Sequence, residues 1–148
     1  MTLDREALCR LIPHAGGMCL LDAVIAWDGD RIQCRSWSHL KVDNPLRREG
    51  RIRALHAVEY GAQAMAVHGG LLARERGEVT GSAAYLAAVR DLQFHVEDLD
   101  AVAEPLEVEA EQLMATGGNM MYGFAIQYPD GRAIASGRAM VMAPEETE

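Results

Sequence analysis

The 148-residue sequence lacks a long hydrophobic run, an excess of positive charge and any closely spaced pair of cysteines. Nowhere do about 18 apolar residues follow one another without a charge, so we expect no membrane-spanning helix. The chain carries 14 basic and 22 acidic residues, a formal charge of -8, which argues against a protein that mainly binds nucleic-acid phosphates. The N-terminus has no basic start followed by an apolar stretch, and we therefore expect a soluble, cytoplasmic protein.

Cysteine and histidine are arranged too sparsely to predict a metal site. Cys9, Cys19 and Cys34 are an odd number at wide spacings, and we expect all three to be reduced thiols. The five histidines form neither an HxH nor an HExxH motif. A GxSxG elbow, a Walker loop and a GxGxxG fingerprint are absent as well, which removes the commonest signals of hydrolases and nucleotide-binding proteins.

The hydrophobic pattern predicts a single α+β domain over residues 1–148. We expect a short helix at residues 2–10, capped by Thr2 or Asp4, and one long helix from Arg51 to Ala73. The strand-like runs are residues 18–27, 31–38, 83–94, 106–114, 120–128 and 133–142. About six antiparallel strands and one long helix favour a sheet that wraps around the helix.

The long helix carries a carboxylate, Glu59, within its apolar stripe when residues are placed at about 100° intervals. Burial of a carboxylate is costly unless hydrogen bonds compensate, and Gln63 and His56 lie at the edge of the stripe. Two interpretations stay open: Glu59 reaches water at the rim of the helix, or it is a general acid that stays protonated near neutral pH. The stripe consists of Ile52, Leu55, Val58, Ala62, Met65, Ala66, Gly69 and Leu72.

A second candidate, His39, stands at the end of the second predicted strand, before the loop that leads into the long helix. A side chain at such a position can be fixed by the sheet and still face a cleft. An ordinary surface histidine is the alternative. Spacing alone does not decide between them.

Several segments resemble the hotdog-fold dehydratases of 3-hydroxyacyl thioesters bound to acyl carrier protein (ACP). Residues 12–24, IPHAGGMCLLDAV, are similar to the LPHRYPFLLVDRV opening of that family, and residues 50–64 to its central helix, where Glu precedes Gln by four positions. The order of His39, NPLR, GRI, VEYGAQAMAVHGGLL, AAVRDLQF and GRAMV resembles the ApeP-like branch, which is associated with aryl polyene biosynthesis. The resemblance covers nearly the whole chain.

The resemblance implies a hotdog fold and a homodimer or heterodimer with active sites at the subunit interface. It matches the catalytic histidine and helix carboxylate of the family to His39 and Glu59. We expect His39 to remove the C2 proton of the substrate while Glu59 protonates the departing C3 hydroxyl. Backbone N–H groups of Gly50 and Arg51 are expected to polarise the thioester carbonyl, with Gln63 orienting Glu59. The reaction requires no metal and no cofactor.

The implied partner is ACP, which presents the acyl group on phosphopantetheine. Five of the 14 basic residues lie between Lys41 and Arg53. We expect this local positive collar, with Arg47 and Arg48, to receive the phosphate and an acidic carrier helix. A solvated surface is the alternative.

Two other functions remain open. A hotdog acyl thioesterase has the same wrapped helix and a carboxylate on or near it. A catalytically silent subunit of a hetero-oligomeric dehydratase is the second, because the GHFP motif of the family is missing. His39 also lies further upstream of Glu59 than is usual in the family.

Overall fold

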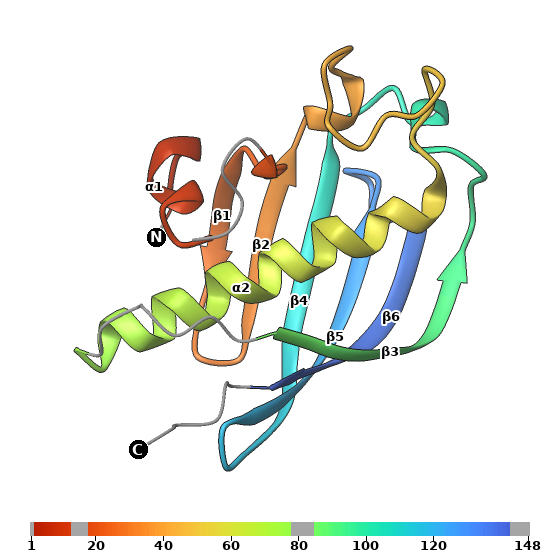
Figure 1. Cartoon of the computed structure of the whole chain (residues 1–148). Coiled ribbons are helices and arrows are strands. Elements are labelled where there is room, and N and C mark those ends of the chain that lie inside the picture. The colour runs from red at the N-terminus through yellow and green to blue at the C-terminus, as the bar shows by residue number, and fades with distance from the viewer. Residues whose placement is uncertain (1, 13–17, 78–84, 143–148) are drawn as a thin grey trace.

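The computed structural model describes residues 2–12, 18–77 and 85–142. Within these ranges, a long helix, α2 (Ala57–Glu75), runs across one face of a six-stranded antiparallel sheet (Figure 1). A short helix, α1 (Arg5–Cys9), begins at Asp4, whose carboxylate accepts a hydrogen bond from the Ala7 N–H at 2.9 Å. The predicted α+β class, with a sheet wrapped around one helix, is confirmed.

The strands pair in the order β1-β2-β4-β5-β6-β3, and every neighbouring pair is antiparallel. Their bounds are β1 Ala23–Trp27, β2 Arg31–Ser36, β3 Tyr85–Phe94, β4 Leu106–Thr116, β5 Asn119–Gln127 and β6 Ala133–Met142. The first strand begins five residues later than predicted, because residues 18–22 enter it without sheet pairing. The other boundaries lie close to the predicted ones.

The two edges of the sheet differ in how they are covered. At the β1 edge, Leu3 and Val24 exchange two backbone hydrogen bonds of 3.0 and 2.9 Å, and α1 packs beside them. At the β3 edge, Leu86 and Phe94 are 42% and 38% exposed. One edge is therefore closed within the chain, whereas the other is open along the described residues.

The helix α2 begins later and buries a different face than the sequence predicts. A 3-10 turn, η3 (Ala54–His56), leads into α2. The residue before this turn, Arg53, is still extended and forms a β-bridge with Asp98, so the helix cannot begin at Arg51. Glu59 and Ala66, placed on the predicted buried stripe, are exposed. That stripe is wrong because α2 is apolar around most of its circumference, so the wheel does not identify the face that packs on the sheet. The buried residues are Ala57, Tyr60, Gly61, Ala64, Met65, Val67, His68 and Leu71.

The cysteines also differ from expectation. Cys9, at the end of α1, forms a disulfide with Cys19 in the segment before β1, so the prediction of three reduced thiols is wrong for this pair. Cys34 is a free thiol, and burial raises its pKa to about 12. A thiol in that environment stays protonated and unreactive.

Candidate active site

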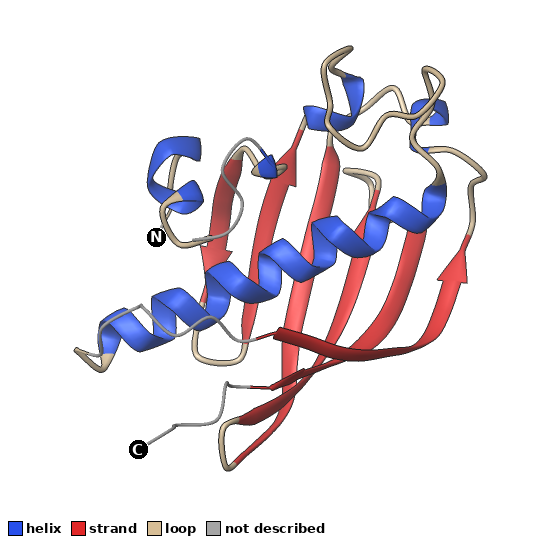
Figure 2. Cartoon of the chain, viewed as in Figure 1, coloured by secondary structure: helices blue, strands red, loops and turns tan. Residues whose placement is uncertain are grey.

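The candidate site lies at one end of the sheet, where short helices and loops gather (Figure 2). His39 sits in a 3-10 turn, η2 (Ser38–Leu40), directly after β2. A second turn, η4 (Leu99–Ala101), precedes β4 and contacts η2. Since β2 and β4 are antiparallel neighbours, the end of one strand meets the start of the other, and distant parts of the chain come together.

His39 is fully buried, and one of its ring nitrogens has a partner. Its Nε2 lies 2.9 Å from the carbonyl oxygen of Val102, and a carbonyl accepts only, so we assign the ring proton to Nε2. Burial lowers the pKa of His39, against the opposite effects of the Val102 and Glu104 carbonyls and of Asp100. The ring is therefore neutral at pH 7. Its Nδ1 is buried and has no hydrogen-bond partner among the described residues, which leaves a lone pair that can accept a proton.

Arg47 ties the loop after η2 together. Its Nη2 donates to the main-chain oxygen of His39 at 2.7 Å, and its Nε donates to that of Lys41 at 2.8 Å. Its Nη1 donates to Gly50 O at 3.0 Å and to Asp100 Oδ1 at 2.6 Å. The guanidinium, predicted to bind the carrier phosphate, thus has all three of its nitrogens engaged within the chain.

Asp100, in η4, accepts hydrogen bonds on both of its oxygens. Its Oδ2 accepts from the Ile52 N–H at 2.9 Å, while Oδ1 accepts from Arg47. Burial acts to raise the pKa of Asp100, but these two hydrogen bonds together with the nearby positive charge of Arg47 hold the pKa below its ordinary value. The carboxylate is therefore charged at pH 7, next to His39.

A buried polar network connects the His39 turn to α2. The Tyr60 hydroxyl lies 2.8 Å from Ser38 Oγ and accepts from Asn44 Nδ2 at 3.2 Å. The same Asn44 nitrogen donates to Ser38 O at 2.8 Å. Ser38 precedes His39 and Tyr60 follows Glu59, so the network joins the neighbours of the two candidate catalytic residues.

Glu59 itself lies exposed on the face of α2 that the sheet does not cover. Its carboxylate forms no hydrogen bond or ion pair with any described residue, His39 included. Gln63, predicted to orient Glu59, donates instead to Met18 O at 2.6 Å and accepts from the Leu20 N–H at 2.8 Å. The Gln63 amide thus fastens the segment before β1 to α2.

Gly50 and Arg51, the predicted donors to the thioester oxygen, lie in the loop before η3. Gly50 has a φ of 77°, a conformation that glycine adopts without strain, and its N–H donates to no described residue. The Arg51 N–H donates to Arg48 O at 3.1 Å, and the Arg51 guanidinium lies 2.6 Å from Asp98 Oδ2. Because α2 begins at Ala57, these N–H groups are not at its N-terminus.

The remaining cations of the predicted collar are on the surface. Lys41, Arg48 and Arg53 are exposed and have no ion pair with any described residue. Arg48 donates only to backbone oxygens, those of Pro45 at 3.0 Å and Arg47 at 2.8 Å. Their charges are therefore available to a partner.

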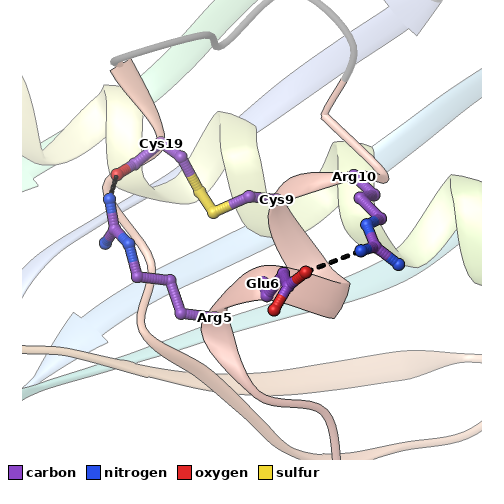
Figure 3. A pocket seen from close by; sticks show the side chains of 5 residues that line it. All are labelled: Arg5, Glu6, Cys9, Arg10 and Cys19. Atoms are coloured by element: carbon purple, nitrogen blue, oxygen red, sulfur yellow. Dashed lines mark hydrogen bonds and ion pairs between the residues drawn. A yellow bond between two sulfur atoms is a disulfide. The ribbon is translucent and has the colours of Figure 1, made fainter.

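A separate pocket lies beside α1 and contains none of the candidate catalytic residues. The residues that line it are Arg5, Glu6, Cys9, Arg10 and Cys19 (Figure 3). Its cations are occupied: Arg10 pairs with Glu6 at 2.6 Å, and Arg5 donates to Cys19 O at 2.9 Å. Across the described part of the chain, no group of three His, Cys, Asp or Glu side chains is placed to hold a metal ion. In the same part of the chain, no helix is long and apolar enough to cross a membrane.

Comparison with known families decides which group the chain falls in. A family model described as ApeP-like, ApeP dehydratase, matches residues 6–148. The chain belongs to the ApeP-like dehydratase family. The family assignment made from the sequence motifs is confirmed, and the assembly of buried His39, Arg47 and Asp100 is part of an ApeP-like dehydratase.

Solved structures share the fold of this ApeP-like chain. The dehydratase heterocomplex ApeI:P from Xenorhabdus doucetiae superimposes with a TM-score of 0.82 at 23% identity, over 95% of this chain and 93% of that one. A thioesterase family protein from Silicibacter pomeroyi gives 0.64 at 16% identity over 96% of both chains. The PaaI protein of the E. coli phenylacetic acid degradation operon gives 0.62 at 13% identity, over 93% and 92%. These likenesses confirm the hotdog fold.

No protein of curated function matches the ApeP-like chain in sequence. Four residues around the His39 turn, which the sequence did not predict, belong to the site in the structure: Ser38, Asn44, Tyr60 and Asp100. The sequence offers little signal for these positions, because Asn44 precedes a proline as an ordinary turn residue would, and Asp100 is one of several acidic residues in its loop.

Proposed function

We propose that the protein dehydrates 3-hydroxyacyl thioesters carried on ACP to trans-2-enoyl thioesters, in fatty acid or aryl polyene biosynthesis. The observation that carries this proposal is the buried His39, whose Nδ1 has no hydrogen-bond partner among the described residues. A general base needs such a lone pair at neutral pH. Membership of a dehydratase family supports the reaction type.

The proposed elimination is balanced with two side chains and no cofactor. His39 Nδ1 takes the C2 proton, the C2–C3 double bond forms, and the C3–O bond breaks as Glu59 protonates the departing hydroxyl to water. The proton on His39 then returns to Glu59 for the next turnover. The free N–H of Gly50 is the first candidate to stabilise the enolate oxygen, with that of Arg51 requiring release from Arg48 O.

A second dehydratase subunit, identical or related, completes the site in this proposal. Glu59 and Ala66 are exposed on the outer face of α2, and Leu55, in the η3 turn before α2, is 60% exposed. Exposed apolar side chains and an open strand edge, such as that of β3, are typical of subunit interfaces. The fold match to a dehydratase heterocomplex supports a partner of this kind.

Substitutions of the catalytic pair test the reaction directly. We expect His39→Ala and Glu59→Gln each to abolish hydration of a crotonyl-type thioester and dehydration of the corresponding 3-hydroxyacyl thioester. His95→Ala is the matched control, because the His95 side chain is exposed and makes no hydrogen bond to any described residue of η2. Wild-type rates in His39→Ala with an intact circular dichroism spectrum would remove His39 as the base.

Acyl thioester hydrolysis is the second candidate, since several of the similar folds are thioesterases. Product analysis separates the two activities. Release of a free thiol from an acyl thioester indicates hydrolysis, and a conjugated enoyl thioester indicates dehydration. Protein that is inert alone, but activates a second dehydratase subunit while its own His39→Ala variant does so equally well, is a silent subunit.

The carrier docks on the positive collar in this proposal. Arg48→Glu is the more specific test, because Arg48 is exposed and forms no ion pair with any described residue. Arg47, in contrast, pairs with Asp100 and donates to His39 O. We expect Arg48→Glu to raise KM for ACP-bound substrate several-fold and to leave KM for a small pantetheine thioester unchanged. Equal effects on both substrates would contradict the collar.

A further inference from the structure

We propose that Arg47 is a positioning residue for His39, anchored by Asp100, and not a ligand of the carrier phosphate. The inference rests on the proposed function, because positioning matters only if His39 is the base.

Four of the five N–H groups of the Arg47 guanidinium donate hydrogen bonds within the chain. Its Nε, Nη1 and Nη2 make four hydrogen bonds of 2.6–3.0 Å within the chain, and its side chain is only 16% exposed. The acceptors on Lys41 and Gly50 lie on either side of Arg47 in the same loop. The planar fork therefore closes the loop, and a bound phosphate would have to replace these bonds.

His39 is held at two points by the segment that contains η4. Its ring donates from Nε2 to Val102 O. Its main-chain oxygen accepts from Arg47, whose other nitrogen binds Asp100 at 2.6 Å. Asp100 and Val102 are two residues apart, so the ring and the backbone of His39 are both attached to one short segment. These two attachments, one of the ring and one of the backbone, set the direction of Nδ1.

The two charges that face His39 also have opposite effects on its protonation. The positive charge of Arg47 lowers the pKa of His39 and the negative charge of Asp100 raises it, while burial, the largest cause, lowers it. Arg47 thus favours both the geometry and the neutral state of a base. Lysine would preserve the charge but not the planar fork, because an ammonium lacks the fixed arrangement of donors.

The test is a comparison of Arg47→Gln and Arg47→Lys with wild type on a small pantetheine thioester. We expect Arg47→Gln to reduce kcat at least about tenfold with KM changed less than about twofold, because a displaced base affects the transition state. The acid limb of its pH–rate profile moves to higher pH, since a positive charge beside His39 is lost and its burial is loosened. Arg47→Lys loses kcat as well, with a smaller movement of that limb.

Nuclear magnetic resonance titration of His39 gives a readout that does not need activity. Its ring signal is assigned by its absence in His39→Ala, and its pKa is expected to rise in Arg47→Gln. Arg35→Gln is the matched control. Arg35, on β2, forms a partly buried ion pair of 2.8 Å with Glu107 on β4, and its side chain makes no hydrogen bond to the η2 turn. It is expected to lower the melting temperature without moving the His39 titration.

The outcomes separate the inference from the proposed function. If His39→Ala is inactive while Arg47→Gln keeps kcat and the wild-type His39 titration, the positioning role is overturned and the dehydratase proposal stands. A raised KM confined to ACP-bound substrate would return Arg47 to phosphate binding. If His39→Ala retains activity, the proposed base fails whatever Arg47 does. Should Arg47→Gln not fold, Asp100→Ala, which removes the acceptor of Arg47 Nη1 but keeps Arg47, is expected to reduce kcat in the same way, and an unchanged kcat there overturns the role.

Discussion

Two histidines of this protein, His39 and His68, are fully buried and differ in what their ring nitrogens bind. In His68, Nδ1 lies 2.7 Å from the Tyr122 hydroxyl and Nε2 lies 2.8 Å from Asp28 O, so both nitrogens are satisfied. In His39, Nδ1 has no partner among the described residues. Burial lowers the pKa of both rings. His68 is therefore a structural group in the core, whereas His39 keeps a nitrogen free for chemistry.

The hydroxyl of Tyr60 is the residue-scale link between the His39 turn and α2. Burial raises the pKa of Tyr60, so it stays protonated, and its hydroxyl is shared with Ser38 and Asn44. We expect Tyr60→Phe to lower the free energy of unfolding by about 1–2 kcal/mol, because buried polar partners lose a hydrogen bond. Urea unfolding measures this. Tyr128→Phe, which removes a hydroxyl without a hydrogen bond to any described residue, is expected to change stability by less than about 0.5 kcal/mol, and equal losses in both would contradict the link.

At the scale of elements, the helix α2 shows what the sequence could and could not predict. Its existence and most of the six strands followed from periodicity, because those patterns are local. The face that α2 packs on the sheet did not follow: Val67 is buried, while the apolar Ala66 beside it is exposed, as is Leu55 in the preceding turn η3. A helical wheel records apolar positions but not whether the same chain or another subunit covers them. The partners of Gln63 and of Arg47 are also set by tertiary contacts that spacing does not encode.

Close packing of α2 on the sheet depends on Gly61. A Cβ at position 61 would lie 2.7 Å from the ring of Phe124 on β5, whereas a Cβ at Gly69 would meet nothing within 4 Å. We expect Gly61→Ala to destabilise the fold by about 1–3 kcal/mol through overpacking. Gly69→Ala is expected to stabilise it by up to about 1 kcal/mol, because alanine is the better helix former.

Chemical denaturation of both glycine variants measures these opposite effects. Phe124→Leu provides a further check, because a smaller side chain removes the clash. The double variant Gly61→Ala with Phe124→Leu is then less destabilised than the sum of the two single variants. Additive losses would show that the ring of Phe124 is not what limits the approach of α2.

The disulfide joins α1 to the segment that Gln63 fastens to α2. Cys9 and Cys19 are bonded and Cys34 is free, so we expect one titratable thiol per chain in denaturant without reductant, and three after reduction. Three thiols before reduction would contradict the bond. Closing a loop of this length stabilises a fold by about 2–3 kcal/mol in the chain-entropy model. Cys9→Ser is therefore expected to lower the melting temperature under non-reducing conditions and to make it insensitive to reductant.

At the scale of the whole molecule, the covered and uncovered surfaces are unevenly distributed. The β1 edge is closed by Leu3 and α1, whereas β3 leaves Leu86 and Phe94 exposed. Glu59 projects from the uncovered face of α2, apart from the buried His39. The two residues proposed as the catalytic pair therefore differ in burial, with His39 inside the fold and Glu59 on its surface. Assembly with a second subunit would then determine activity as much as folding does.

We expect subunits to associate through the outer face of α2. Ala66 lies exposed on that face, so an arginine there fits the isolated fold but places a bulky charge within an apolar contact. We expect Ala66→Arg to reduce the mass measured by light scattering to that of a single chain and to abolish activity, with the circular dichroism spectrum unchanged. The control is Met114→Arg, since Met114 is 60% exposed at the far end of β4, and it is expected to keep both assembly and activity.

An Ala66→Arg variant that stays assembled and active would place the partner elsewhere, on the β3 edge alone. A monomeric wild-type chain that becomes active only with a second dehydratase subunit would instead identify that subunit as the occupant, and Ala66→Arg would then block its binding.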